Sequence, residues 1–327
     1  MDNSPAKLSP LWESFIRDFR TNEGSFRAYG LNHQISNDRI RRFWKFARGV
    51  NAAARLTSNA LELMQGQALR FLSALLLGGR FSAGLYNLGR YTSLDYDNDL
   101  LEAYENELGP HGLYFSHNTL KSFSYLRRLA PFLNDESPGP LTVLEIGAGL
   151  FNFGHLLTLR LESFTYVVVD LPSMIDRAVE QVATYPAKSY EVFTEGQLEE
   201  FWSSTADRRV LFIPPNRLIE LGGKIRFDLF VNHESFAEMP LPVVNEYLGD
   251  VKALLRAEAL VFLVNRISRV QSVRKRVTVT PEAITDFYLY DLSAITQVSV
   301  ELDHFRLRET SSTLDAQNIS FVGIYRP

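Results

Sequence analysis

The stretch from Leu141 to Asp170 constrains the fold of this chain more than any other part of the sequence. Its first part, Thr142 to Ile146, is a short apolar run followed by two closely spaced glycines, which is typical of a buried parallel strand that ends in a tight turn. Leucines and phenylalanines then recur at helical spacing as far as Leu161, and a run rich in β-branched residues from Tyr166 to Val169 predicts another strand. The sequence therefore predicts a strand, a turn, a helix and a second, parallel strand in succession.

The glycine turn is a candidate ligand-binding site. Gly147 and Gly149 allow the backbone to bend sharply and to approach a ligand where a Cβ atom would obstruct it. Alone, these two glycines are equally compatible with an ordinary turn. Asp170, however, ends the second strand, where a carboxylate can accept hydrogen bonds from both hydroxyls of a ribose. Together with Glu145, which precedes the turn, Asp170 indicates a nucleoside pocket.

The residues around the turn distinguish between nucleotide cofactors. A dinucleotide site has a third glycine three residues after the second, and that position is Asn152 here. The carboxylate of Glu145 would repel a pyrophosphate but would attract a cationic ligand. Both residues disfavour an oxidoreductase with a nicotinamide cofactor, and both are compatible with S-adenosylmethionine, which carries a positively charged sulfonium.

The composition limits the class of protein. A chain of 327 residues with 46% hydrophobic and 22% charged residues is typical of a globular protein with one large or two ordinary domains. The formal net charge of -4 provides no general attraction to nucleic acid. The chain has no cysteine, its polar start lacks a signal-peptide core, and no apolar tract approaches the roughly 20 residues that span a bilayer. We expect a cytoplasmic protein that binds neither nucleic acid nor a membrane.

The pattern of elements changes near residue 115. Residues 1–115 carry amphipathic stripes at helical spacing and predict a helical N-terminal domain that covers an acceptor site or forms a homodimer. In residues 116–327 strands alternate with helices, which predicts a mostly parallel, Rossmann-like α/β sheet. The alternating segment Val298 to Leu302 and the apolar segment Ile319 to Tyr325 predict a closing antiparallel hairpin.

Two further strands are expected in the middle of this second region. Val210 to Ile213 is the one strand that we expect between Asp170 and Leu221, and Phe227 to Val231 is an apolar strand after it. The second of these strands leads into a turn from Asn232 to Pro240. This turn would lie at the carboxyl edge of the sheet, where open α/β sheets bind ligands.

The motifs VLEIGAG and VVVDLP together resemble the first two motifs of class I S-adenosylmethionine-dependent methyltransferases, in which a parallel sheet is closed by an antiparallel hairpin. Phe151 stands where the third glycine of the family's first motif is expected. With the turn NHESFAEM, these motifs resemble the sugar O-methyltransferase family of bacterial carbohydrate and natural-product pathways, over roughly residues 116 to 327. The resemblance implies S-adenosyl-L-methionine as the cofactor of an S-adenosylmethionine-binding domain at 116–327, held by residues Glu145, Gly147, Gly149, Asp170, Leu171, Asn232 and Ser116.

The expected chemistry requires one proton acceptor. Methyl transfer from a sulfonium is an in-line displacement, so the protein orients two reactants and removes a proton from a hydroxyl acceptor. His233 is the first candidate for this base, because an imidazole titrates near neutrality and this residue lies at the carboxyl end of the fourth strand. Glu234 and Glu238 are the next candidates, either as orienting groups for His233 or as the base. The sequence offers no second cluster of acids, so we expect no metal.

Several functions remain open at this point. The leading expectation is O-methylation of a small-molecule acceptor, a sugar or a glycosylated natural product. Methylation of nitrogen or carbon is an alternative. Phe151 in the glycine motif also motivates a cofactor-binding partner protein without catalysis.

Overall fold

The computed structural model describes one α/β unit in most detail. The chain divides into two compact units, and the larger includes Tyr125–His304 and Leu314–Pro327. Most of the expected helical domain at 1–115 lies outside the described residues, so that domain and its boundary stay a prediction. The described residues are 103, 106–107, 117–133, 139–185, 189–266, 287–303 and 318–327.

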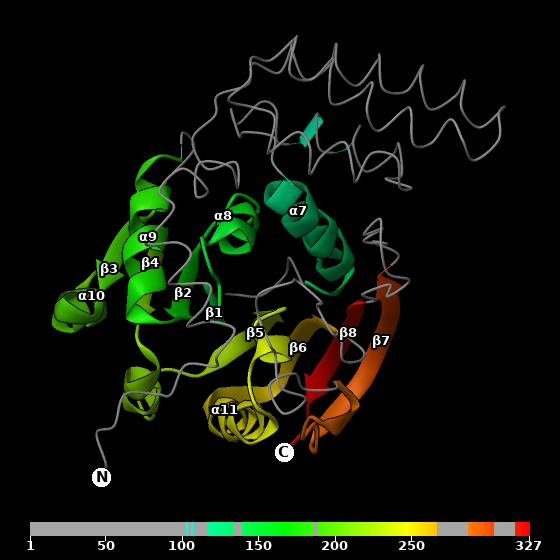
Figure 1. Ribbon diagram of the computed structural model, residues 1–327. Helices are drawn as coiled ribbons and strands as arrows, with labels where there is room; N and C mark the ends of the chain where they lie inside the picture. The colour runs from blue at the N-terminus through cyan, green and yellow to red at the C-terminus, as the bar shows by residue number, and fades with distance from the viewer. Residues whose placement is uncertain are drawn as a thin grey trace, which may run out of the picture. The chain divides into compact units, whose positions relative to one another are not determined.

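The larger unit is built on one eight-stranded sheet with the order β3-β4-β2-β1-β5-β6-β8-β7 (Figure 1). Neighbouring strands from β3 to β6 pair in parallel, whereas β8 pairs antiparallel with both β6 and β7. This confirms the expected Rossmann-like sheet that is mostly parallel and ends in an antiparallel C-terminal pair. The strands are β1 (Leu141–Ile146), β2 (Phe164–Val169), β3 (Glu191–Thr194), β4 (Arg208–Ile213), β5 (Phe227–His233), β6 (Leu255–Arg266), β7 (Ile295–Asp303) and β8 (Asn318–Tyr325).

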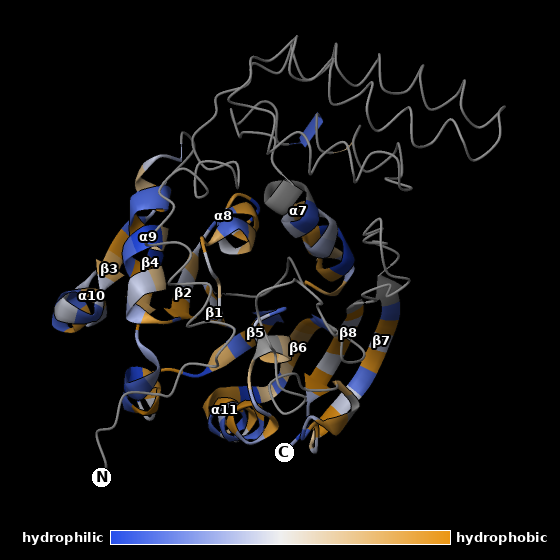
Figure 2. Ribbon diagram, in the orientation of Figure 1, coloured by the Kyte–Doolittle hydropathy of each residue, from blue (hydrophilic) through white to orange (hydrophobic). Residues whose placement is uncertain are grey.

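Helices cover the sheet and supply the rest of the core. Leu144 and Ile146 of β1 share a buried hydrophobic cluster with α11, whereas Tyr166 of β2 contacts Phe151 at the start of α8. Figure 2 shows largely hydrophobic strands, while α9, α10 and α11 carry both hydrophobic and hydrophilic residues. The α-helices are α7 (His117–Leu129), α8 (Asn152–Thr158), α9 (Pro172–Ala183), α10 (Leu198–Ser203) and α11 (Leu241–Leu254). Short 3-10 helices occupy Ala130–Phe132 (η2), Glu195–Gln197 (η3), Pro215–Leu221 (η4), Phe236–Glu238 (η5) and Phe287–Leu289 (η7).

Three elements differ from the sequence-based expectation. The segment before Leu221 contains two strands rather than one, because the four residues of β3 form an edge strand too short to show a period. Helix α8 ends at Thr158 and not near Leu161. Strand β5 continues to His233, so Asn232 and His233 belong to the strand and not to the turn after it. The candidate base therefore lies on a rigid element.

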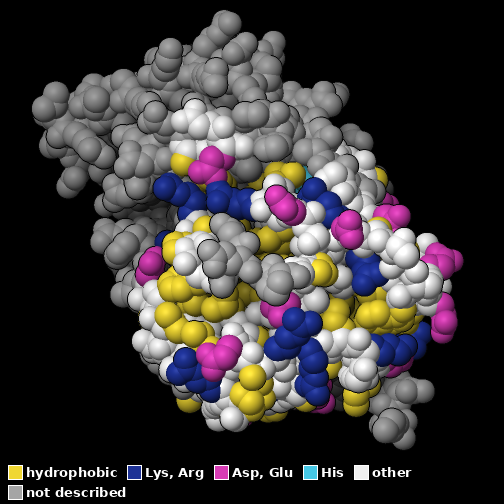
Figure 3. All heavy atoms as spheres, turned by 180° about the vertical axis from the view of Figure 1, so that it is seen from behind, with side chains coloured by type: hydrophobic (Ala, Val, Ile, Leu, Met, Phe, Trp, Pro, Cys, Tyr) yellow, Lys and Arg dark blue, Asp and Glu magenta, His cyan; other side chains and the backbone are white. Residues whose placement is uncertain are grey.

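The edge of the sheet at β7 is well exposed. Val298 and Val300, whose alternation with polar residues predicted this strand, have exposed fractions of 45% and 39%. Figure 3 shows hydrophobic side chains in groups among Lys and Arg on the described part of one face of the surface. The alternation thus identifies the strand correctly without marking a buried face.

Among the described residues, no helix has the length and apolar character needed to cross a bilayer.

Candidate functional site

The two glycines of the turn after β1 have different structural roles. Both adopt positive φ, 74° at Gly147 and 58° at Gly149, which favours glycine over any residue with a Cβ atom. A Cβ atom on Gly147 would lie 2.1 Å from Oγ of Ser235, so the turn after β5 packs directly against this position. At Gly149, no atom of the described residues lies within 4 Å of such a Cβ atom, apart from Gly149 itself and its two neighbours in the chain. The turn is therefore closed on the side of Ser235 and open at Gly149.

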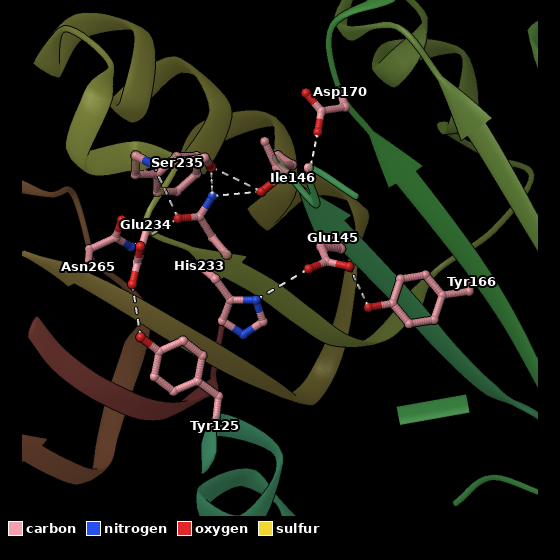
Figure 4. A network of polar contacts seen from close by, with 12 residues as sticks. Tyr125, Glu145, Ile146, Tyr166, Asp170, His233, Glu234, Ser235 and Asn265 are labelled. Atoms are coloured by element: carbon pink, nitrogen blue, oxygen red, sulfur yellow. Dashed lines mark hydrogen bonds and ion pairs between the residues drawn. The ribbon is translucent and has the colours of Figure 1, made fainter. Parts of the chain in front are cut away.

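Asp170 binds this open part of the turn from the end of β2 (Figure 4). Its Oδ2 accepts a hydrogen bond from the backbone N–H of Gly149 at 2.8 Å, and its Oδ1 accepts one from the N–H of Leu171 at 2.7 Å. A carboxylate has about four acceptor positions, so two remain for the hydroxyls of a ribose. Asp170, the residue predicted to bind the ribose, is thus held in place by the same turn that would bind the cofactor.

Burial raises the pKa of the Asp170 carboxyl from 3.8 to about 7, even though the N–H groups of Leu171 and Gly149 lower it. The nearby charge of Glu145 raises the pKa further. The folded protein therefore keeps a proton on Asp170 that the unfolded chain releases above about pH 4. Near neutral pH, small changes in the surroundings of this group change its charge.

This shift predicts how stability depends on pH. Because the folded state binds the extra proton between about pH 4 and pH 7, the contribution of Asp170 to the free energy of unfolding falls as the pH rises through that interval. The full shift corresponds to at most about 4 kcal/mol. Urea unfolding of the wild type and of Asp170→Asn at pH 5 and pH 8 measures this contribution to the free energy of unfolding. The wild type should lose stability relative to the variant at pH 8, and a constant difference between the two would contradict the assignment.

Glu145 lies inside the protein between two side chains from neighbouring strands (Figure 4). Its exposed fraction is 1%. Oε2 accepts a hydrogen bond of 2.8 Å from the hydroxyl of Tyr166 on β2, and Oε1 lies 3.3 Å from Nδ1 of His233 on β5. Sequence reasoning missed both partners. Because side chains alternate along a strand, Glu145 and Tyr166 point to the opposite face from their neighbours in the chain. This alternation does not show which residues of other strands they contact.

His233 is enclosed by aromatic rings. The ring of Tyr125 on α7 stacks on it with centroids 5.4 Å apart, and Phe153 on α8 and Phe262 on β6 approach it at 4.1 Å and 5.6 Å. Its Nε2 is buried and has no hydrogen-bond partner within the described part of the chain. One ring nitrogen thus faces a carboxylate, and the other is an unsatisfied polar atom in an aromatic surrounding.

The turn after β5 is fixed to the end of β1 by buried amides. The side-chain amide of Asn232 donates to the carbonyl of Ile146 at 2.8 Å and to Oγ of Ser235 at 2.6 Å. Its oxygen accepts a hydrogen bond of 2.9 Å from Asn265, whose own oxygen accepts the N–H of Ala237. Asn265 was not anticipated, although a polar residue at the end of an apolar strand is a visible signal. These contacts give Asn232 an architectural role, and its role as a cofactor ligand stays a prediction.

Two of the remaining predicted residues, Glu234 and Glu238, follow β5. Glu234 has a φ of 61°, and its Oε1 accepts a hydrogen bond of 2.9 Å from the hydroxyl of Tyr125. Glu238 lies in η5, and Ser116 lies outside the described residues. The carboxylate that faces Nδ1 of His233 is that of Glu145. The described part of the chain contains no group of three or more His, Asp or Glu residues that could hold a metal ion.

Phe151 occupies the third glycine position with a glycine-like backbone. Its φ of 60° and ψ of 26° are left-handed, a conformation that costs a non-glycine residue about 1–2 kcal/mol. Its ring is fully buried and packs edge-on against Tyr166 and Phe212, with centroids 5.1 Å and 5.3 Å apart. A Cβ atom on Gly154 would lie only 2.0 Å from this ring. The ring therefore lies in the core beside α8, where Gly154 leaves room for it.

This arrangement predicts a coupled effect of Phe151 and Gly154 on stability. Alanine is usually better than glycine in a helix by about 1 kcal/mol, but Gly154→Ala should lower the free energy of unfolding by about 1–3 kcal/mol, because its methyl group collides with the ring. In a Phe151→Ala background the same change should be neutral or stabilising. Urea unfolding of the four proteins measures the coupling.

Gly249 on α11 is the matched control for that cycle. No atom within the described residues lies within 4 Å of a Cβ atom built on Gly249, so Gly249→Ala should stabilise the protein. Equal effects of Gly154→Ala with and without Phe151 would show that the ring does not occupy this space.

Of the comparisons with known proteins, the one with solved structures gives matches. No known family model matches the sequence, and no curated protein matches it significantly. Solved structures with a similar arrangement include the magnesium protoporphyrin IX methyltransferase of Synechocystis with bound SAH, at 12% identity over 70% of this chain and 99% of that chain, with a TM-score of 0.42. The N-methyltransferase NodS of Bradyrhizobium japonicum is similar at 13% identity over 63% and 95% of the two chains, with a TM-score of 0.40.

A carbon methyltransferase, CurJ, is also similar, at 15% identity over 81% of this chain and 71% of that chain, with a TM-score of 0.40. The printed names of two of these structures, NodS and CurJ, state methylation of nitrogen and of carbon. At these identities and TM-scores, the fold of the present chain is defined by its own strand order and by its antiparallel C-terminal pair.

Proposed function

We propose that this protein is an S-adenosylmethionine-dependent methyltransferase that transfers a methyl group to a hydroxyl of a small molecule. The observation that carries the proposal is that three features lie at the carboxyl ends of the neighbouring strands β1, β2 and β5. These features are the open turn at Gly149, the carboxyl of Asp170 with free acceptor positions, and the buried pair of His233 and Glu145. A sugar or a glycosylated natural product is the acceptor class that the sequence resemblance supplies.

The residues present suit an adenosyl sulfonium compound. Asp170 would accept hydrogen bonds from the ribose hydroxyls, and the absence of side chains at Gly147 and Gly149 would admit the ligand close to the backbone. When bound, S-adenosylmethionine supplies a methyl group on a positively charged sulfur. Because the ring of Phe151 lies in the core, it does not reduce the open space at the turn.

His233 provides the proton acceptor that a hydroxyl substrate needs. In the transfer, the methyl group would exchange its bond to sulfur for a bond to the acceptor oxygen, leaving S-adenosylhomocysteine, and the proton of that hydroxyl would pass to Nε2 of the imidazole. General-base catalysis of this kind contributes about 10²- to 10⁴-fold to a rate. Because Nε2 is buried, the acceptor reaches it only if side chains around His233 move.

The enclosure of Nε2 also supports a second candidate function. A protein that binds the cofactor and transfers nothing would have no need for an accessible base, and the covered His233 would then be part of the packing. This candidate predicts cofactor binding without turnover.

Calorimetry and a transfer assay separate the two functions. S-adenosylmethionine and S-adenosylhomocysteine should both bind to the full chain with one site each. Cofactor with a labelled methyl group, incubated with a set of sugars, glycosylated natural products and simple amines, should transfer label to a hydroxylated compound. Binding without transfer to any compound would favour the second function, label on an amine would change the acceptor atom, and no binding would refute both functions.

A further inference from the structure

The acid before the glycine turn is the residue that the family resemblance assigns to the cofactor, but its contacts indicate another task. Both carboxylate oxygens of Glu145 are directed at side chains of this chain, Oε2 at Tyr166 and Oε1 at His233 (Figure 4). Burial of a carboxylate without hydrogen-bond or charge partners costs free energy, so these two contacts stabilise Glu145 in its buried position. Neither oxygen is directed at the open space beside Gly149.

Tyr166 acts as a fixed donor to this carboxylate. Its ring is fully buried on β2, and burial together with the neighbouring charge of Glu145 raises the pKa of the phenol well above its usual value. The hydroxyl therefore stays protonated and donates its hydrogen to Oε2 of Glu145. Because one oxygen is held in this way, the other oxygen is aligned toward β5.

The carboxylate selects one tautomer of His233. A carboxylate oxygen accepts hydrogen bonds, so Glu145, whose Oε1 lies 3.3 Å from Nδ1, favours the tautomer that carries its proton on Nδ1. Nε2 then keeps its lone pair as a proton acceptor. The aromatic side chains of Tyr125, Phe153 and Phe262 also pack around the ring, and the hydroxyl of Tyr125 is bonded to Glu234.

The buried Nε2 without a hydrogen-bond partner is the observation that indicates a catalytic role for this cluster. A buried polar atom without a partner costs about 1–3 kcal/mol, so such an atom in a native protein calls for an explanation, and a catalytic role is one. A purely structural cluster would gain stability from a hydrogen bond at this atom. The cluster instead ends at a lone pair that points to no described donor.

We propose that Glu145 and Tyr166 are positioning residues that hold His233 as its Nδ1–H tautomer and keep Nε2 as the acceptor of the substrate proton. Glu145 is then absent from the set of cofactor ligands. The catalytic consequence rests on the proposed methyl transfer, whereas the tautomer and the role of Glu145 in binding are properties of the protein alone.

Nuclear magnetic resonance of imidazole nitrogens tests the tautomer without any substrate. The chain has six histidines, so a spectrum of His233→Gln identifies the signals of His233. In the full-length wild type at neutral pH, the nitrogen shifts should show the proton on Nδ1, and in Glu145→Gln the populations should move toward the Nε2–H form. A wild-type spectrum with the proton on Nε2, or a spectrum that Glu145→Gln leaves unchanged, would overturn the proposal.

Kinetics and calorimetry test the role. Glu145→Gln should bind S-adenosylmethionine within about threefold of the wild type, whereas kcat should fall by about 10²-fold with little change in KM. Glu145→Asp should restore part of kcat. A large loss of cofactor affinity in Glu145→Gln would return this residue to the cofactor site. If the wild type binds no cofactor, the proposed function fails, and the tautomer measurement still decides the positioning role.

Two further variants keep the test independent of folding. Tyr166→Phe removes the hydroxyl and leaves the carboxylate, so it should shift the His233 signals less than Glu145→Gln does. Thr142→Val removes a partly buried hydrogen bond to Asp228 on β5, at the opposite end of β1. It should lower stability but leave the His233 signals unchanged. Equal effects of Thr142→Val and Glu145→Gln on these signals would show a general disturbance of β1.

Discussion

Replacement of His233 by alanine is expected to lower kcat for methyl transfer by about 10²- to 10⁴-fold, because the acceptor hydroxyl then loses its general base. Cofactor affinity should stay within a few fold, since the imidazole faces Glu145 and aromatic rings and not the open turn at Gly149. Single-turnover transfer from labelled cofactor, together with calorimetry, measures both quantities. Normal turnover in this variant would exclude His233 as the base.

The control for this experiment has to separate chemistry from packing. His233→Ala leaves Glu145 without its partner on β5 and opens space between Tyr125 and Phe153, so it should also lower stability. His233→Gln keeps more of the volume and a polar group near Glu145 but cannot accept a proton. If both variants lose turnover to the same extent while His233→Gln is the more stable, the loss comes from the missing base.

The central strands of the sheet could be predicted because nearly all of their residues are apolar and buried. All six positions of β2 are buried, and the last four, Tyr166 to Val169, show in the sequence as an unbroken run of apolar and aromatic residues. The antiparallel C-terminal pair also followed from the local pattern of its two segments. Strand β3 was missed for the opposite reason, since four residues at an edge have neither a continuous apolar run nor a clear alternation.

The site could be predicted only where it depends on neighbouring residues in the chain. The turn at Gly147 and Gly149 is a local feature, and so is the place of Asp170 at the end of a strand. The partners of Glu145 are not local, because Tyr166 and His233 reach it through the order and register of β2, β1 and β5. The sequence shows a carboxylate, a phenol and an imidazole without showing that they meet.

Phe151 also shows that contacts between side chains are not visible in the sequence, even for two residues that are close together in the chain. By comparison with the family motif, its ring would be expected to obstruct the cofactor, because the sequence does not specify where a side chain at positive φ points. The direction is decided by Gly154, which leaves a space beside α8 for the ring. Two residues three positions apart thus compensate each other, and neither is informative alone.

Replacement of Asp170 by alanine is expected to weaken the binding of S-adenosylmethionine by about 10²-fold or more. Each charge-assisted hydrogen bond from a ribose hydroxyl to the carboxylate contributes about 1.5–3 kcal/mol, and 1.4 kcal/mol corresponds to tenfold in affinity. The variant also releases the N–H of Gly149, so the turn loses the contact that holds its open part in place. Calorimetry at pH 8 is the appropriate measurement, because the carboxyl, with a pKa of about 7, is mostly ionised there.

The dependence of this affinity on pH gives the assignment a second, independent test. Wild-type affinity should rise between pH 6 and pH 8 as Asp170 ionises, since hydroxyls bind a carboxylate more strongly than a neutral carboxyl. Asp170→Asn should bind more weakly at pH 8 and should show little of this rise, because its amide does not titrate in this range. Asp176 on α9 is exposed, and Asp176→Ala is the matched control with wild-type affinity at both pH values. Unchanged affinity in Asp170→Ala, or the same rise with pH in Asp170→Asn, would mean that the ribose is bound elsewhere and that the carboxyl of Asp170 serves only to hold the turn.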